Sequence, residues 1–266
     1  MTSQIWSRSE IVTAKRIVVK VGSSSISGEN VGQIAPLVDA LAAAHGRGCE
    51  VILVSSGAIA TGIPFLNLDA RPTDLATQQA AAAVGQNLLI YRYQDSLRRF
   101  KIVAGQVLLT AGDLENPTHR GNAQRAMERL LDLRILPIVN ENDTVATHEI
   151  RFGDNDRLAA LVSQLVHADL LVLLSDIDAL YTRPPLAPGA VKITEVAFDD
   201  DLSRVEFGDI GAAGVGTGGA GTKVAAAKLA AASGTPVLLA STGDVSAALS
   251  GADVGTWFAA KQLVAD

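Results

Sequence analysis

The sequence predicts an α/β fold, a three-layer αβα open sandwich around a mostly parallel central sheet, from three observations. Short apolar runs typical of strands alternate with longer segments of helical period along the chain. The first two runs flank one helical segment, which is the order of a right-handed βαβ unit with parallel strands. The 266 residues are 48% hydrophobic and 19% charged, enough to bury a sizeable core as one domain, residues 1–266.

The first βαβ unit is the clearest part of this pattern. Residues 17–21 and 51–54 are β-branched runs that predict buried strands. Between them, apolar residues recur on one helical face at Ile34, Leu37, Val38 and Leu41, and the pattern stops near Gly46. Further strands are expected at 102–109, 135–140, 170–175 and 237–240, and further helices at 74–99, 120–133, 157–167 and 224–233.

Two segments interrupt the alternation. Residues 183–190 carry three prolines and predict a hairpin tip or an exposed loop. Residues 208–221 contain seven glycines and lead directly into Thr222 and Lys223. The glycines fit G-x-G-x-x-G, but no apolar strand precedes them, and Thr222-Lys223 reverses the order that a Walker A motif requires. We therefore interpret this segment as a phosphate-facing loop that ends in a lysine.

Composition argues against several classes of protein. The net charge of −6 and the absence of a basic stripe argue against nucleic-acid binding. No apolar run is long enough to span a membrane, and no signal peptide is visible, so we expect a cytoplasmic location. Four histidines at unrelated spacings predict no protein-held metal site. The single cysteine, Cys49, enters an apolar strand and is expected in the core, not as a nucleophile.

Small or polar residues follow the predicted strands, where open parallel sheets bind their ligands. These strand-end segments are residues 20–25, 55–58, 140–143 and 175–176. Glycines beside small hydroxyl residues, as at Gly22, let backbone N–H groups approach phosphate oxygens. Lys20 and Lys223 each adjoin such a turn and would offset the charge of a transferring phosphoryl group.

The polar run Asp154-Asn155-Asp156 precedes a predicted helix and allows several interpretations. One of the three residues is explained as a helix N-cap. An aspartate here could orient the lysines through a charge-assisted hydrogen bond, and an asparagine could bind the polar end of a substrate. A carboxylate pair that binds a metal is a third option.

Six sequence blocks resemble the glutamate 5-kinases of the amino-acid kinase family. They are VVKVGSS (18–24), VSSGAIATG (54–62), PIVNENDTV (137–145), RFGDND (151–156), LLSDIDALYT (173–182) and GVGTGGAGTK (214–223). The resemblance implies phosphorylation of the γ-carboxylate of L-glutamate by ATP and Mg²⁺, the first step of proline biosynthesis. It also implies a glutamate-binding half at about 14–170 and an ATP-binding half at about 171–260.

Carried over by motif position, the resemblance assigns roles to individual residues. Lys20 and Lys223 would be the catalytic lysines, held by Asp156. The glutamate site would include Ser56, Gly57, Asp143 and Asn155. The nucleotide site would include Lys20, Gly22, Ser175, Asp176, Thr217, Gly218, Gly219, Ala220, Gly221, Thr222 and Lys223.

The sequence also departs from the pattern of the family. Many members carry a further C-terminal PUA domain, and the chain ends at Asp266 soon after the kinase pattern closes, so we expect a kinase domain without it. The glycine loop has GGAGTK where many relatives have GGMSTK. Relatives are often inhibited by proline and form dimers or tetramers.

Alternative functions are an N-acetylglutamate kinase, a catalytically idle amino-acid sensor of the same fold and, more remotely, a dinucleotide-dependent oxidoreductase.

Overall fold

The computed structural model describes residues 4–68, 70–146, 155–207 and 219–262. Its strands are β1 (Arg16–Val21), β2 (Glu50–Ser55), β3 (Ala104–Leu109), β4 (Leu136–Glu141), β5 (Leu170–Ser175), β6 (Leu180–Tyr181), β7 (Lys192–Ile193), β8 (Glu195–Val196), β9 (Val237–Ser241) and β10 (Thr256–Phe258). Its α-helices are α1 (Ile34–Gly46), α2 (Ala58–Gly62), α3 (Leu75–Leu97), α4 (Ala111–Glu115), α5 (Pro117–Asp132), α6 (Asn155–Leu165), α7 (Ala220–Ala232) and α8 (Val245–Leu249).

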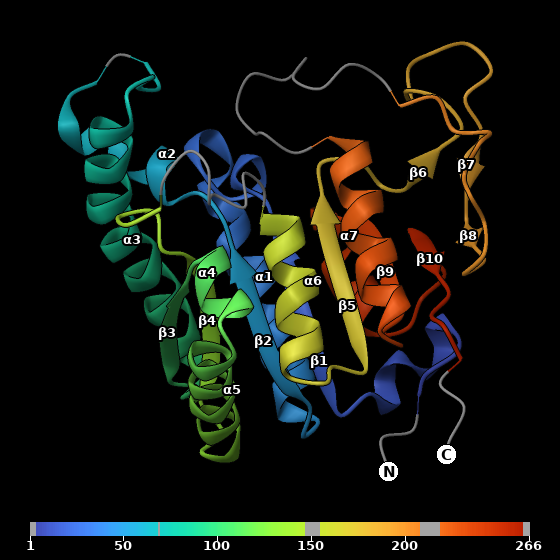
Figure 1. Ribbon diagram of the computed structural model, residues 1–266, viewed down its shortest axis with the longest axis horizontal. Helices are drawn as coiled ribbons and strands as arrows, with labels where there is room; N and C mark the ends of the chain where they lie inside the picture. The colour runs from blue at the N-terminus through green and yellow to red at the C-terminus, as the bar shows by residue number, and fades with distance from the viewer. Residues whose placement is uncertain (1–3, 69, 147–154, 208–218, 263–266) are drawn as a thin grey trace.

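The main sheet has the strand order β3-β4-β2-β1-β5-β9-β10-β8. All pairings from β3 to β9 are parallel, and β10 joins β9 in the antiparallel sense. The prediction of a mostly parallel sheet is therefore confirmed. In the register of the central strands Val21 pairs with Ser55 and with Leu174, so β1, β2 and β5 end at nearly the same level. Figure 1 shows the arrowhead of β5 at this edge, opposite the two chain termini.

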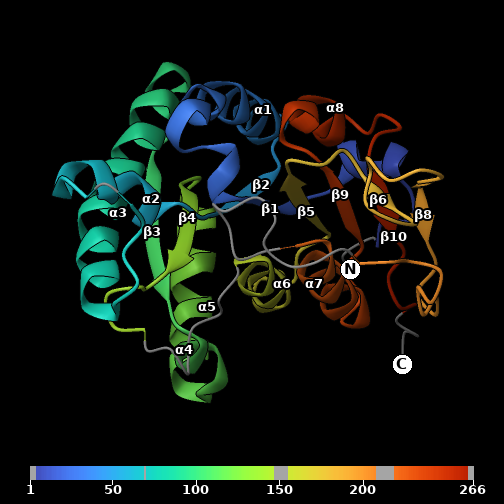
Figure 2. The same ribbon diagram turned by 90° about the horizontal axis from the view of Figure 1, so that it is seen from above.

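Helices cover both faces of the sheet, as the αβα prediction requires. Helices α1 and α8 lie on one side, and α5, α6 and α7 lie on the other (Figure 2). Successive strand residues point to opposite faces: Ile17 and Val19 of β1 belong to the core under α1 and α8, whereas Val18 belongs to the core under α6 and α7. By the same alternation, Lys20 faces α6 and α7.

The predicted strands and helices are present in the structure with slightly different ends, but the short helices α2, α4 and α8 were not predicted. The proline-rich segment connects the antiparallel strands β6 and β7, and Leu186 within it is fully exposed, so the hairpin prediction is confirmed. Cys49 is buried, and burial raises the pKa of its thiol to about 12, as expected for a core residue. Strands β6, β7, β8 and β10 were not predicted, because two or three residues show no period.

Helices α2 and α3 touch through their backbones. A Cβ atom added to Gly85 would lie 1.8 Å from the carbonyl oxygen of Ala58, and one added to Gly62 would lie 1.9 Å from that of Ala81. The chain enters α2 at Gly57, whose φ of +97° is a left-handed conformation that favours glycine. This contact places the start of α2 and the middle of α3 beside the ends of β2 and β4.

We expect Gly85→Ala to destabilise the fold, because its methyl group would overlap the backbone of α2. Overpacking of this kind costs about 3 kcal/mol or more when the obstructing atoms are backbone. Thermal unfolding should show a clear drop in Tm. Gly46→Ala is the matched control, since a Cβ there meets no atom within 4 Å. Equal Tm values for the two variants would contradict the close packing of α2 and α3.

Candidate active site

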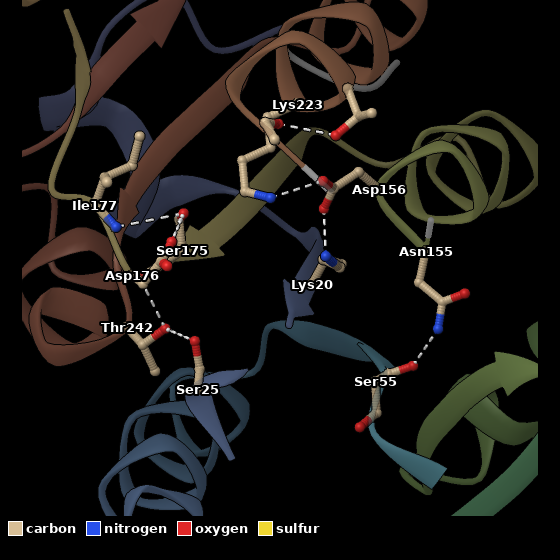
Figure 3. Close-up of polar contacts among 12 residues, drawn as sticks. Lys20, Ser25, Ser55, Asn155, Asp156, Ser175, Asp176, Ile177, Lys223 and Thr242 are labelled. Carbon is tan, nitrogen blue, oxygen red and sulfur yellow. Dashed lines mark hydrogen bonds and ion pairs between the residues drawn. The ribbon is translucent and has the colours of Figure 1, made fainter. Parts of the chain in front are cut away.

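Three charged side chains from distant parts of the sequence meet at the carboxyl edge of the sheet (Figure 3). Asp156 lies in the first turn of α6, and its Oδ2 accepts a hydrogen bond from Lys223 Nζ of α7 at 2.9 Å. Its Oδ1 forms an ion pair with Lys20 Nζ of β1. Asp156 is 0% exposed, Lys223 is 8% exposed and Lys20 is 3% exposed. The structure thus brings together the two lysines and the aspartate that the sequence analysis singled out.

The electrostatic balance keeps Asp156 ionised. Burial alone would raise the pKa of this carboxyl group, but the ammonium groups of Lys20 and Lys223 outweigh burial and hold the pKa below its usual value. The N-terminal end of α6 adds favourable partial charge. One carboxylate and two ammonium groups together give these three residues a net positive charge. Such a group suits a polyanionic ligand.

The turn after β1 has little room for a side chain beside the ammonium group of Lys20. A Cβ atom built on Gly22 would lie 3.8 Å from Lys20 Nζ and 4.0 Å from Ser24 Oγ, so a side chain at this position would fill the space next to the ammonium group. The turn after β2 packs against the same region, because a Cβ on Gly57 would lie 3.4 Å from Ser23 Oγ. The turns after β1 and β2 therefore pack against each other, and Gly22 lies beside Lys20.

Hydroxyl groups connect the turn after β1 with the ends of β5 and β9. Thr242 Oγ1 lies 2.9 Å from Ser25 Oγ and 3.1 Å from the carbonyl oxygen of Ser175. Ser175 Oγ donates to Asp176 Oδ1 at 2.9 Å. Figure 3 shows this cluster on one side of the lysines, with Asn155 and Ser55 on the other. Ser175 and Asp176, which were predicted to bind the nucleotide, therefore lie on the opposite side of the charged group from Asn155, which was predicted to bind glutamate.

Asn155 connects α6 to the ends of two strands. Its Nδ2 donates to the carbonyl oxygen of Ser55 at 2.7 Å and to Asn140 Oδ1 at 2.8 Å. Ser56 is half-buried directly after β2, and Asp143 is half-buried in the turn after β4. Ser56, Asp143 and Asn155 thus lie on neighbouring elements at the same edge.

Some predicted residues have a different local structure from the one expected. The helix expected from Val224 begins at Ala220, so Ala220, Gly221, Thr222 and Lys223 form its first turn, with Gly219 as N-cap. Asn155 and Asp156 belong to α6 itself and do not precede it. Thr217, Gly218 and Asp154 lie outside the described residues.

The sequence analysis did not single out two polar residues of α3 that hydrogen-bond to the ends of β2 and β4. Asn140 Nδ2 donates to Gln86 Oε1 at 2.6 Å, and Ser55 Oγ lies 2.9 Å from the hydroxyl of Tyr93. Gln86 and Tyr93 lie on α3. Their signal was the helical spacing that they share with buried apolar residues, namely Ala82, Leu89 and Leu97. That spacing places both polar residues on the buried face of α3.

In the described part of the chain, no group of three His, Cys, Asp or Glu residues gathers in a metal-binding arrangement. None of the helices described has the length and hydropathy needed to cross a membrane.

We expect Asp156→Asn to destabilise the protein, because it removes the carboxylate that pairs with both buried ammonium groups. Removal of one member of a buried ion pair costs about 3–5 kcal/mol. The lowered pKa means that Asp156 stabilises the fold fully above the ordinary aspartate value of about 4 and loses this effect as the pH falls through its folded pKa. Urea unfolding between about pH 3 and 7 should therefore give a flatter stability profile for the variant than for the wild type.

Asp39→Asn is the matched control for this prediction. Asp39 pairs with Arg99 at 2.7 Å, but both side chains are about half exposed, so the pair should contribute less than about 1 kcal/mol. Similar losses of stability in Asp156→Asn and Asp39→Asn would contradict a large contribution of the buried ion pairs to the free energy of unfolding.

Comparison with known proteins agrees with this geometry. The model of the amino acid kinase family matches residues 15–241. A glutamate 5-kinase of Clavibacter sepedonicus is 75% identical over 95% of this chain and 97% of its own length, and one of Leifsonia xyli subsp. xyli is 74% identical over 97% and 96%. A glutamate 5-kinase of Salinispora arenicola is 55% identical over 94% of this chain and 69% of its own length.

A solved structure supports the fold. The carbamate kinase of Giardia lamblia bound to AMP-PNP superposes with a TM-score of 0.67 at 16% identity and covers 94% of this chain. At this identity the likeness extends to the fold alone. The family match and the curated relatives show that this chain belongs to the amino acid kinase family and, within it, to the glutamate 5-kinases.

Proposed function

We propose that this kinase transfers the γ-phosphoryl group of ATP to the γ-carboxylate of L-glutamate, which yields L-glutamate 5-phosphate and ADP in the first step of proline biosynthesis. The observation that carries the proposal is the pair of buried lysines, Lys20 and Lys223, held by the single carboxylate of Asp156. The names of the relatives support the choice of acceptor.

The residues present fit a triphosphate beside the lysines. The absence of a side chain at Gly22 leaves space next to Lys20 Nζ, and Lys223 approaches the same point from the first turn of α7. Ser175, Asp176 and the segment 217–223 would bind the nucleotide from the half of the chain at about 171–260. Mg²⁺ would enter with the nucleotide and neutralise phosphate charge.

The reaction needs charge neutralisation and alignment more than proton transfer. A carboxylate is already ionised at neutral pH, so no general base is required. An oxygen of the γ-carboxylate forms a bond to the γ-phosphorus, and the bond from that phosphorus to the bridging oxygen breaks, with its electron pair passing to ADP. Lys20 and Lys223 would stabilise the charge on the transferring group, and Asp156 would hold both ammonium groups in place.

Glutamate would bind at the ends of β2 and β4, within the half of the chain at about 14–170. Backbone N–H groups at Ser56 and Gly57 could receive a carboxylate at the start of α2. Asp143 offers negative charge to a free α-ammonium group, which N-acetylglutamate lacks. Asn155 would contact the same end of the substrate.

Three further properties stay predictions. They are inhibition by proline, assembly into dimers or tetramers and a cytoplasmic location.

Release of ADP should be measured with ATP, Mg²⁺ and each candidate acceptor, with hydroxylamine added to trap an acyl phosphate as hydroxamate. Hydroxamate with glutamate, but not with N-acetylglutamate or aspartate, is the expected result. ADP release without hydroxamate would contradict acyl phosphate formation. ATP binding without turnover of any acceptor would favour an amino-acid sensor instead.

Lys20→Ala and Lys223→Ala should each lower kcat by about 10²–10³-fold, the usual loss when one electrostatic contact to a transition state is removed. The KM for glutamate should change little, because the lysines act on the transferring group. The hydroxamate assay measures both constants. Lys228→Ala on the same helix as Lys223 is the control and should retain full activity. Near-normal turnover in either active-site variant would remove the role assigned to that lysine.

Asp143→Asn should raise the KM for glutamate at least about tenfold, since a charge-assisted contact to the α-ammonium group is worth about 1.5–3 kcal/mol. The kcat should fall less, because the reacting carboxylate is at the other end of the substrate. Asp132→Asn, at the exposed end of α5, controls for the change in net charge. An unchanged KM in Asp143→Asn would contradict the assignment.

A further inference from the structure

Gln86 belongs to a chain of buried amides that leads to the proposed glutamate site, and nothing above assigns it a function. We propose that Gln86 is a positioning residue: through Asn140 it holds the amide of Asn155 so that an acceptor oxygen, and no donor, faces the substrate. This inference rests on the proposed function. It explains how the site would recognise a free amino group.

The nitrogen and oxygen atoms of Asn140 and Asn155 can be assigned from their contacts with backbone groups. The carbonyl oxygen of Ser55 can only accept, so the group of Asn155 that contacts it must be Nδ2. The backbone N–H of Glu141 can only donate, so the atom of Asn140 that it contacts at 2.9 Å must be Oδ1. Asn140 Oδ1 also accepts from Asn155 Nδ2. Asn140 therefore has Nδ2 left to donate, and Gln86 Oε1 accepts it at 2.6 Å.

Among the described residues, this arrangement leaves one acceptor on Asn155 for a ligand. Both hydrogens of Asn155 Nδ2 are used, by Ser55 and Asn140. An amide whose donors are occupied can offer only its oxygen, and an oxygen binds an ammonium group but not a carboxylate. Asn155 and the carboxylate of Asp143 would then select the same group of the substrate.

Gln86 itself is retained at an energetic disadvantage. Its side chain is 8% exposed, and its Nε2 is buried with no hydrogen-bond partner among the described residues. A buried donor without a partner destabilises a protein, so a residue that only filled this space would better be apolar. The contact from Oε1 to Asn140 is the compensating feature, because it completes the hydrogen bonds of Asn140.

The chain of amides lies on the β4 side of the lysines. Val54 pairs with Val139, so Ser55 and Asn140 end neighbouring strands, and β1 with Lys20 is one strand further. Two strand spacings separate β1 from β4, about 10 Å. A five-carbon amino acid with its γ-carboxylate at the lysines would place its ammonium end towards Asn155 and Asn140. Tyr93 holds Ser55 from α3 as well, so one helix supports both strand ends.

The test compares two variants of Gln86 with two ligands. Gln86→Met removes the acceptor at similar side-chain length, and Gln86→Glu keeps an oxygen where Asn140 donates. Glutamate carries the ammonium group, and glutarate, measured as a competitive inhibitor, lacks it. We expect Gln86→Met to raise the KM for glutamate at least tenfold while kcat and the Ki for glutarate stay within twofold. Gln86→Glu should keep all three constants within threefold.

The control is Asn87→Met, an exposed neighbour on the same helix, which should leave all constants unchanged. An unchanged KM in Gln86→Met would overturn the role of Gln86, as would equal losses for glutamate and glutarate, which indicate general damage to the site. A larger loss in Gln86→Glu than in Gln86→Met would also overturn it, because the donor Nε2 would then be the important atom. No hydroxamate from the wild type would instead contradict the proposed function.

Discussion

The ion pairs of Asp156 with Lys20 and Lys223 are the interaction on which the geometry of the active site depends. Burial of charged groups costs free energy, because the groups lose their hydration. The attraction between opposite charges offsets this cost only if each charge is held close to its partner. That demand determines the arrangement of β1, α6 and α7. The alternation of β1 turns Lys20 towards the helices, and the small residues between α6 and α7 let Lys223 approach. These small residues include Ala159, Ala160, Ala226, Ala227 and Ala230.

Much of the fold could be predicted from the sequence, because its strands are buried on both faces and therefore appear as uninterrupted apolar runs. The strands at 17–21, 51–54 and 170–175 were found within a residue of their ends. The short strands β6–β8 and β10 could not be found. Their pairing depends on contacts with distant strands, as in the antiparallel pair of β10 with β9, and leaves no local pattern.

Site residues could be predicted where reactive or charged side chains stand next to a recognisable local sequence pattern. Lys20 and Lys223 adjoin glycine-rich turns, and the rule that ligands bind at strand ends placed them together. The sequence left the role of Asp156 open among a cap, a lysine partner and a metal ligand, and only the three-dimensional contacts distinguish these. The helical spacing of Gln86 could have placed it on the buried face of α3, but its role could not be found until its partner, Asn140, is known.

The shared carboxylate of Asp156 also constrains how this kinase can change over generations. Loss of Asp156 alone leaves two buried cations, and loss of one lysine alters the balance of the remaining pair, whereas replacement of all three by apolar residues can be neutral or even stabilising. Variants that have lost only one or two of the three charged residues are less stable than the protein with all three or with none. A lineage that no longer needs phosphoryl transfer should therefore retain all three residues for a long time or lack all three, and sequences with only one of them should be rare.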